Sequence, residues 1–329
     1  MMRQLFRWLA GIILCGAILS LASASSPGVD RKGELLPLPA VRLAQVKGDW
    51  SKVKVVLQAS LPSSPREMMV YRVVYPRADG DYVNKLSRAF VLDSRVEQGP
   101  DSLMVRSEPR ALEVYPATGA FWFKDASALW SGKKPSSLPS ETAGVEIAER
   151  FLRNYDLLPK GMAFESTGHS TLKVYDVASG QTAAYDTDLH VNFRLSVVGI
   201  PVAGPGGKIK VYLGEGSRLI GLYWAGFDVQ PHKPYPLISA AKAVSLLEEH
   251  GVVTTVKQPR KVTISEVSLV YYAQPGLEVQ EYLEPVYRFR GEVEGEEGSE
   301  PYLQYVPAIE GKYLKPLPAS SEDSPPRGK

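Results

Sequence analysis

Residues 189–198 read LHVNFRLSVV, and apolar and polar side chains alternate along the whole run. A period of two is typical of a β-strand that has one covered face and one wetter face. The valine, phenylalanine and leucine side chains are expected on the covered face, while Asn192, Arg194 and Ser196 are expected on the other. This segment therefore predicts an antiparallel sheet with one open side.

Strand patterns of the same kind occur on both sides of this segment. The clearest are predicted at 53–57, 69–75, 103–106, 112–115, 121–123, 171–177, 208–213, 219–227, 262–272, 282–290 and 302–308. The dipeptide Thr118-Gly119 is expected to turn the chain between two of them, and Gly214 and Gly216 to turn a later hairpin. The chain is thus expected to be rich in short hairpins.

Three amphipathic helices interrupt the strands. The first is expected to be capped by Asp81, and the others to begin at Ser140 and Ser239, with Gly251 as the C-cap of the third. Each helix is followed by several strands, and apolar positions recur at matching offsets after Ser140 and Ser239. This order predicts an α+β fold, built as tandem units of one helix packed on an antiparallel sheet.

The predicted domains follow from these patterns and from the two ends of the chain. Arg3 and Arg7 precede an uncharged apolar run, and Ala22-Ser23-Ala24 forms an A-x-A site. This order predicts a signal peptide at 1–24, with an uncleaved anchor as the alternative. The remaining ranges are expected to be a Pro-rich tether at 25–48, an N-terminal α+β unit at 49–130, a central unit at 138–230, a C-terminal unit at 236–314 and a disordered tail at 317–329.

Composition excludes several classes of function. Lys and Arg number 38 and Asp and Glu number 36, so the chain lacks the strong basic excess that favours nucleic acid. The single cysteine, Cys15, lies inside the predicted leader. A processed chain would therefore have no disulfide, no cysteine nucleophile and no thiolate metal site.

The sequence contains no catalytic motif of a common type. The four histidines, none in an H-E-x-x-H pair, are His169, His190, His232 and His250. Glu248-Glu249-His250 is interpreted as a solvated helix end rather than a metal or acid–base cluster. The glycine-rich run at 204–207 lies between strands, so a hairpin turn is favoured over a phosphate-binding loop. No catalytic residue is predicted.

Two pairs of aspartates are candidate calcium ligands. Asp186 and Asp188 bracket one residue, and so do Asp79 and Asp81, but neither pair has further oxygen ligands at fixed spacing. The acidic connection at 291–300 is expected to be a solvated hairpin loop. No metal and no cofactor are therefore predicted.

Four aromatic residues on adjacent predicted strands are interpreted first as sheet core, with a possible interaction surface as the alternative: Tyr212, Tyr223, Trp224 and Phe227. A structural turn is predicted after the strand at 189–198, with residues Gly199, Pro201, Gly204 and Gly206. Gly199 is expected to permit a positive φ, and Pro201 to end the strand pairing.

The segments 193–202, 208–211 and 216–223 resemble the propeptide (FTP) motif of thermolysin- and fungalysin-type proteases. The helix from Ser239, the strand ending at Arg288-Phe289, and the run 305–311 resemble a PepSY domain. The likeness covers about 140–313, and over this range the chain is similar to YycH/YycI-type extracytoplasmic regulators. It implies a protein that acts by binding, and it carries over no catalytic residue.

The sequence thus predicts an extracytoplasmic, non-catalytic binding or regulatory protein, either secreted or anchored at the outer face of the cytoplasmic membrane. The expected partner is another envelope protein, a protease or a sensor kinase, bound for instance by strand addition at a sheet edge. Nucleic acid is not expected, and membrane contact is expected only through an uncleaved N-terminal segment. Two alternatives stay open: a secreted hydrolase using Asp and Glu, and an envelope structural protein that binds polysaccharide.

Overall fold

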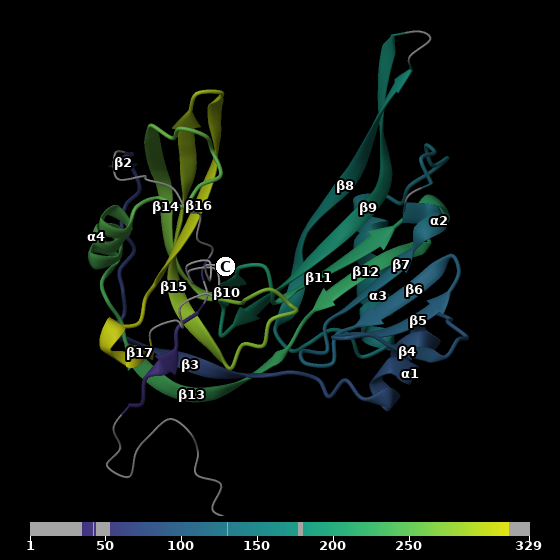
Figure 1. Cartoon of the computed structure of the whole chain (residues 1–329), viewed down its shortest axis with the longest axis horizontal. Helices are drawn as coiled ribbons and strands as arrows, with labels where there is room; N and C mark the ends of the chain where they lie inside the picture. Colours follow the sequence, from purple (N-terminus) through teal and green to yellow (C-terminus); the bar gives the residue numbers. More distant parts are fainter. Residues whose placement is uncertain (1–34, 42, 44–52, 130, 177–179, 316–329) are drawn as a thin grey trace, which may run out of the picture.

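A computed structural model gives the fold, and it describes residues 35–41, 43, 53–129, 131–176 and 180–315 (Figure 1). The predicted signal peptide, most of the predicted tether and the predicted tail lie outside the described residues. No helix among the described residues is long and apolar enough to cross a membrane.

The predicted fold class is wrong. The chain is 49% strand and 17% helix, and fifteen strands join in one mixed sheet rather than in tandem helix-on-sheet units. The error has a physical reason: the period of two in a sequence locates a strand but does not show with which other strand it pairs. Strand β3 (Glu67–Val74), for example, pairs with β13 (Asp228–Pro236) and with β15 (Tyr282–Gly295), which come from the far end of the chain.

The sheet bends into a U with two lobes (Figure 1). We call the lobe that carries three helices the helix-covered lobe. Its strands, which are antiparallel to their neighbours, are β4 (Val96–Gln98), β5 (Leu103–Ser107), β6 (Arg110–Val114), β7 (Phe121–Asp125), β8 (Met162–Asp176), β9 (Gln181–Val197), β11 (Lys208–Leu213) and β12 (Leu219–Ala225).

The second lobe, here the C-terminal lobe, contains strands from both ends of the chain. They are β2 (Lys54–Leu57), β14 (Lys261–Tyr272), β15 and β16 (Gly298–Pro307). A separate two-stranded sheet joins β1 (Leu38–Pro39) to β17 (Leu314–Lys315). The lobes are connected by β3 and β13, and by β10 (Ile200–Ala203), which pairs with β9 on one side and with β14 on the other.

Side-chain caps start the longer helices. They are α1 (Gly80–Ala89), α3 (Glu141–Asn154) and α4 (Ala240–His250), while α2 (Ala126–Leu129) and the 3-10 turns η1 (Glu215–Ser217) and η2 (Gly311–Tyr313) are short. Ser140 and Ser239 cap α3 and α4 as predicted, and Gly251 ends α4 at a φ of +85°. The cap of α1 is Asp79, whose carboxylate accepts a hydrogen bond from the Tyr82 amide at 3.2 Å. The expectation for Asp81 is therefore wrong, because the helix begins earlier.

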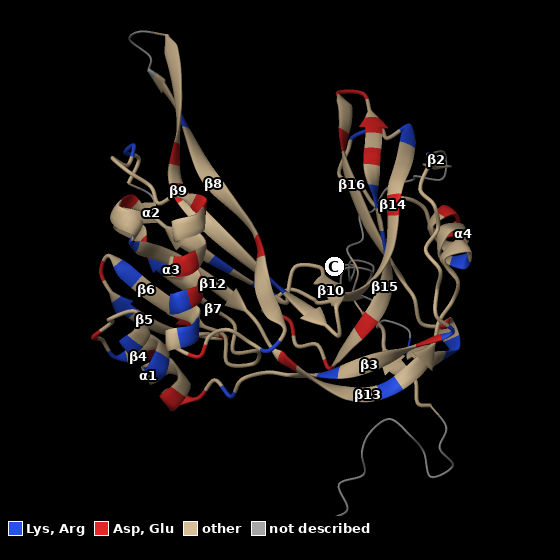
Figure 2. Ribbon diagram, turned by 180° about the vertical axis from the view of Figure 1, so that it is seen from behind, with Lys and Arg blue, Asp and Glu red and all other residues tan. Residues whose placement is uncertain are grey.

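Helices α1 and α3 cover one face of the helix-covered lobe, as the view from behind in Figure 2 shows. Phe90, at the end of α1, stacks on Phe123 of β7 with ring centroids 4.2 Å apart, and lies 5.7 Å from Phe151 of α3. The inward side chains of β9 are buried there, and its Asn192 and Arg194 are half-buried on the opposite face. The predicted alternation of β9 is confirmed.

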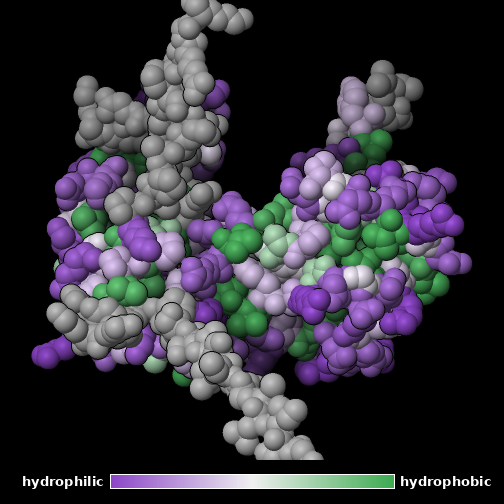
Figure 3. Space-filling view, turned by 60° about the horizontal axis from the view of Figure 1, so that its bottom comes forward, coloured by the Kyte–Doolittle hydropathy of each residue, from purple (hydrophilic) through white to green (hydrophobic). Residues whose placement is uncertain are grey.

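Most buried side chains of both lobes belong to one large cluster, and a small second cluster surrounds Val270 and Val286. The large cluster contains Val83 and Phe193 of the helix-covered lobe together with Ile264 and Phe289 of the C-terminal lobe. The space-filling view in Figure 3 nevertheless shows a notch in the outline between the lobes. The two lobes are therefore parts of one packed body that is hollowed on one side.

Candidate functional site

The face of the helix-covered lobe that α1 and α3 leave open carries a cluster of aromatic rings. Trp122 of β7 lies 5.7 Å from Tyr212 of β11 and 5.4 Å from Tyr223 of β12, measured between ring centroids. The three strands are hydrogen-bonded neighbours, and Tyr223 is directly opposite Trp122 in the register. All three side chains are half-buried. Period-two alternation places them there, since their neighbours Phe121 and Phe123 point into the core.

The ammonium group of a lysine lies over each of these rings. The Nζ atom of Lys124 lies 5.3 Å from the Trp122 ring, that of Lys210 lies 5.0 Å from Tyr212, and that of Lys208 lies 5.8 Å from Tyr223. These are cation–π distances. We call these six residues the lysine–aromatic face.

The positive charges of these lysines are only partly neutralised by nearby carboxylates. Among the described residues, none of the three forms an ion pair with a carboxylate. Burial, followed by the like charges of Arg194 and Lys210, lowers the pKa of Lys208. Burial likewise lowers the pKa of Lys210, against a smaller opposing effect of Asp188. A group of positive charges that is partly removed from solvent is a favourable binding site for an anion.

A cavity of about 450 Å³ opens on this face. Besides the rings and two of the lysines, it is lined by Asn192, Arg194 and Ser166. The Nε1 atom of Trp122 is shielded from solvent and has no hydrogen-bond partner among the described residues. A volume of this size is within the range of small-ligand sites. The cavity therefore combines flat rings, cations, neutral hydrogen-bonding groups and the carboxylate of Glu165.

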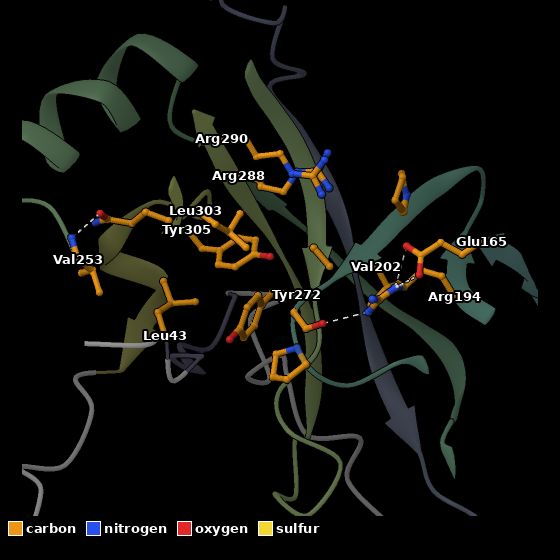
Figure 4. Close-up of a pocket in the computed structure, with 15 residues that line it drawn as sticks. Leu43, Glu165, Arg194, Val202, Val253, Tyr272, Arg288, Arg290, Leu303 and Tyr305 are labelled. Atoms are coloured by element: carbon orange, nitrogen blue, oxygen red, sulfur yellow. Dashed lines mark hydrogen bonds and ion pairs between the residues drawn. The ribbon is translucent and has the colours of Figure 1, made fainter. Parts of the chain in front are cut away.

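A second cavity, of about 440 Å³, lies where the two lobes meet (Figure 4). Arg194 and Glu165 line both cavities. The Arg194 guanidinium donates to the Glu165 carboxylate at 3.3 Å and to the carbonyl oxygens of Gly204 and Gly206 at 3.0 and 3.2 Å. Arg194 is therefore occupied as a structural link between β8, β9 and the loop at 204–207, whereas the neighbouring lysines are not.

The C-terminal side of the second cavity is also aromatic and basic. Tyr272 and Tyr305 lie with ring centroids 4.9 Å apart, and Arg288 donates to Glu266 at 2.8 Å. Burial raises the pKa of Tyr272 to about 12. Sequence reasoning assigned none of these residues to a site, and Arg288 and Tyr305 entered it only through the PepSY resemblance.

The structure divides the predicted interaction surface in two. Tyr212 and Tyr223 belong to the lysine–aromatic face, but Trp224 and Phe227 are buried in the core. Trp224 stacks on Phe121 and donates its indole N–H to the Leu157 carbonyl at 2.7 Å. Trp122 was missed, although it alternates with Phe121 and Phe123 in β7 just as Tyr223 alternates with its neighbours in β12.

The predicted turn residues are found in two turns. Val198 and Gly199 form the two-residue turn between β9 and β10, with φ of +51° and +77°. Pro201 lies inside β10, and its pair with Ser196 is the last one between β9 and β10, because Val202 and Ala203 pair with β14. Gly206 lies in the next loop, where a β-carbon would come within 2.1 Å of the Gln274 carbonyl oxygen.

The histidine and aspartate candidates are dispersed. His190 Nδ1 lies 3.2 Å from an Asp188 carboxylate oxygen. Burial opposes ionisation of Asp188, but hydrogen bonds from His190, Ser170 and Thr187 outweigh it and lower its pKa. Glu248, Glu249 and His250 lie exposed at the end of α4. Among the described residues, no group of three or more His, Cys, Asp or Glu side chains is arranged to hold a metal ion.

His190 lies beside the open face, with its ring centroid 5.6 Å from that of Tyr212, whereas His169 and His232 have other surroundings. His169 Nδ1 donates a hydrogen bond to the Asp188 carbonyl oxygen at 2.9 Å, and lies 3.9 Å from the Asp186 carboxylate. Burial and the nearby charges of Arg72 and Lys233 lower the pKa of His232, whose ring is tilted against that of Tyr282 with centroids 4.8 Å apart. The structure does not bring the four histidines together.

No family model and no curated protein matches this chain. Among solved structures, an uncharacterized protein from Eubacterium rectale is similar over 82% of this chain and 92% of its own length, with 12% identity and a TM-score of 0.42. A likeness at that TM-score carries no argument about function. The resemblance to PepSY and propeptide domains therefore stays a prediction.

Proposed function

We propose that this protein is an extracytoplasmic, non-catalytic binding or regulatory protein that holds its ligand on the lysine–aromatic face. The observation that carries the proposal is the pairing of each of three clustered rings with a lysine that lacks a carboxylate partner among the described residues. Large rings and cations that a fold leaves open are typical of binding surfaces. Modulation of an envelope protease or sensor kinase is the regulatory role that the sequence resemblance suggests.

The hydrolase alternative has less support. Glycosidases need two carboxyl groups across a cleft. Glu165 is the one carboxylate among the described residues that line the two cavities, so no second lining carboxylate faces it across either one.

Photo-crosslinking tests the binding role without assuming a ligand class. Ser166 is an exposed residue of β8 that lines the cavity on the face, and Lys242 is exposed on α4. We expect p-benzoylphenylalanine at Ser166, but not at Lys242, to form an adduct in an envelope extract. The absence of an adduct at Ser166, or equal adducts at both positions, would contradict the proposed function.

A further inference from the structure

We propose that the ligand of the lysine–aromatic face is an acidic polysaccharide chain, whose sugar rings lie on Trp122, Tyr212 and Tyr223 while its carboxylates contact the lysines. This inference rests on the proposed function and specifies its ligand. It is carried by three properties of the face: its excess of positive charge, its rigid rings and its saturated backbone.

Charge is the first property. Lys208 and Lys210 are two residues apart on β11, so both side chains point from the same side of the sheet. Arg194 lies directly opposite Lys208 in the register, but its guanidinium is already bound to Glu165 and to two carbonyl groups. An anion placed beside these lysines would relieve their mutual repulsion and gain charge-assisted hydrogen bonds. The face therefore selects negatively charged ligands.

The rings are the second property. Trp122 packs against both tyrosines, which fixes the orientation of all three rings before a ligand arrives. Aromatic faces carry partial negative charge and attract C–H groups with partial positive charge. A pyranose ring presents such C–H groups on its flat side and hydroxyl groups at its edge. Asn192 and Ser166, bonded to each other at 3.1 Å, line the cavity and are available for those hydroxyls.

The saturated backbone is the third property, and it disfavours an acidic peptide. A peptide gains most from main-chain hydrogen bonds at an open sheet edge. Strand β11 is paired on one side with β9 and on the other with β12, and β12 is paired in turn with β7. A ligand on this face is therefore held by side chains alone, which suits a stiff sugar chain better than a flexible peptide.

Titration calorimetry with three polymers tests the inference: polygalacturonate, which is acidic and made of rings; polyglutamate, which is acidic without rings; and dextran, which has neutral rings. The variants are K208Q/K210Q and Tyr223→Leu. The matched control is K242Q/K257Q, which removes the same charge from exposed positions on and after α4. Thermal melting confirms that each variant is folded, and Tyr212→Leu replaces Tyr223→Leu if the latter is not.

We expect the wild-type protein to bind polygalacturonate, and K208Q/K210Q to weaken this by about tenfold or more. Tyr223→Leu should weaken it by about fivefold, and the control double variant should bind as the wild type does. Equal affinity for polyglutamate, or equal affinity for dextran, would overturn the inference, and so would a wild-type protein that binds no polygalacturonate. An adduct at Ser166 in any of these cases would show that the proposed function survives without this ligand class.

Discussion

Val198 and Gly199 form the turn between β9 and β10, and Val198 is under backbone strain. Its φ of +51° is unfavourable for a β-branched residue, and its side chain is 85% exposed. We expect Val198→Asn to raise the free energy of unfolding by about 1 kcal/mol, because asparagine tolerates this conformation and suits a two-residue hairpin. Chemical denaturation measures the change, and an unchanged midpoint would contradict it.

Gly199 provides the opposite test at the same turn. Its φ is +77°, and a β-carbon at this position would meet no atom within 4 Å. Gly199→Val is therefore expected to lower the free energy of unfolding by over about 1 kcal/mol through the backbone alone. Gly199→Asn is the matched control and should cost less. Equal losses in the two variants would show that crowding, rather than backbone conformation, determines the effect.

Glu284 couples stability to pH. This side chain is 2% exposed in β15, opposite Tyr272, and burial raises the pKa of its carboxyl to about 8. The folded state therefore retains a proton that the unfolded state releases above its ordinary pKa of 4.5. This effect makes the free energy of unfolding fall as the pH rises from about 5 to about 8, at up to about 1.4 kcal/mol per pH unit.

The neutral variant Glu284→Gln should lack this dependence. Its free energy of unfolding, relative to the wild type, is expected to increase steadily between about pH 5 and pH 8 and to level off above. The exposed neighbour Glu281 supplies the control Glu281→Gln, which should parallel the wild type. A constant difference between Glu284→Gln and the wild type across this range would contradict a protonated Glu284.

At the level of single elements, two nearby aspartates have different roles at the start of α1. Asp79 accepts the amide of Tyr82, whereas Asp81 is exposed within the first turn. Asp79→Ala is expected to lower the melting midpoint and to cost about 1 kcal/mol, the usual effect of losing an N-cap. Asp81→Ala should cost only a few tenths of that amount through the helix dipole. A larger loss of stability in Asp81→Ala than in Asp79→Ala would show that Asp81 is the N-cap, as the sequence pattern predicts.

The positions of the elements could be predicted from the sequence much better than their partners. The alternation in β9 and the serine caps of α3 and α4 are local properties, so they could be read directly. The pairing of β10 with β14, which links the lobes, depends on contacts between distant segments. The same limit applies to the site: Trp122 has the strand pattern of a core residue, and only the position of α1 and α3 leaves its side of the sheet open.

At the level of the whole molecule, the shared core predicts cooperative unfolding. Buried residues of both lobes belong to one cluster, and β3, β10 and β13 run between the lobes. We therefore expect one calorimetric transition whose enthalpy equals the van't Hoff enthalpy. The segment 138–230, produced alone, should fail to unfold cooperatively. Two or three separate transitions in the full chain would support independent units instead.

The pairing of β3 with β13 and β15 also has a consequence for how the chain is made. The hydrogen bond from the Gln280 amide to the Tyr75 hydroxyl joins positions 205 residues apart. Contacts so distant in sequence make folding slow, because a long loop must close before they form. A growing chain therefore carries β2 and β3 without their partners until β13 and β14, far along the sequence, have been made. During that interval, their exposed strand edges are sites at which another chain could pair, so the early segments depend on being kept apart from one another.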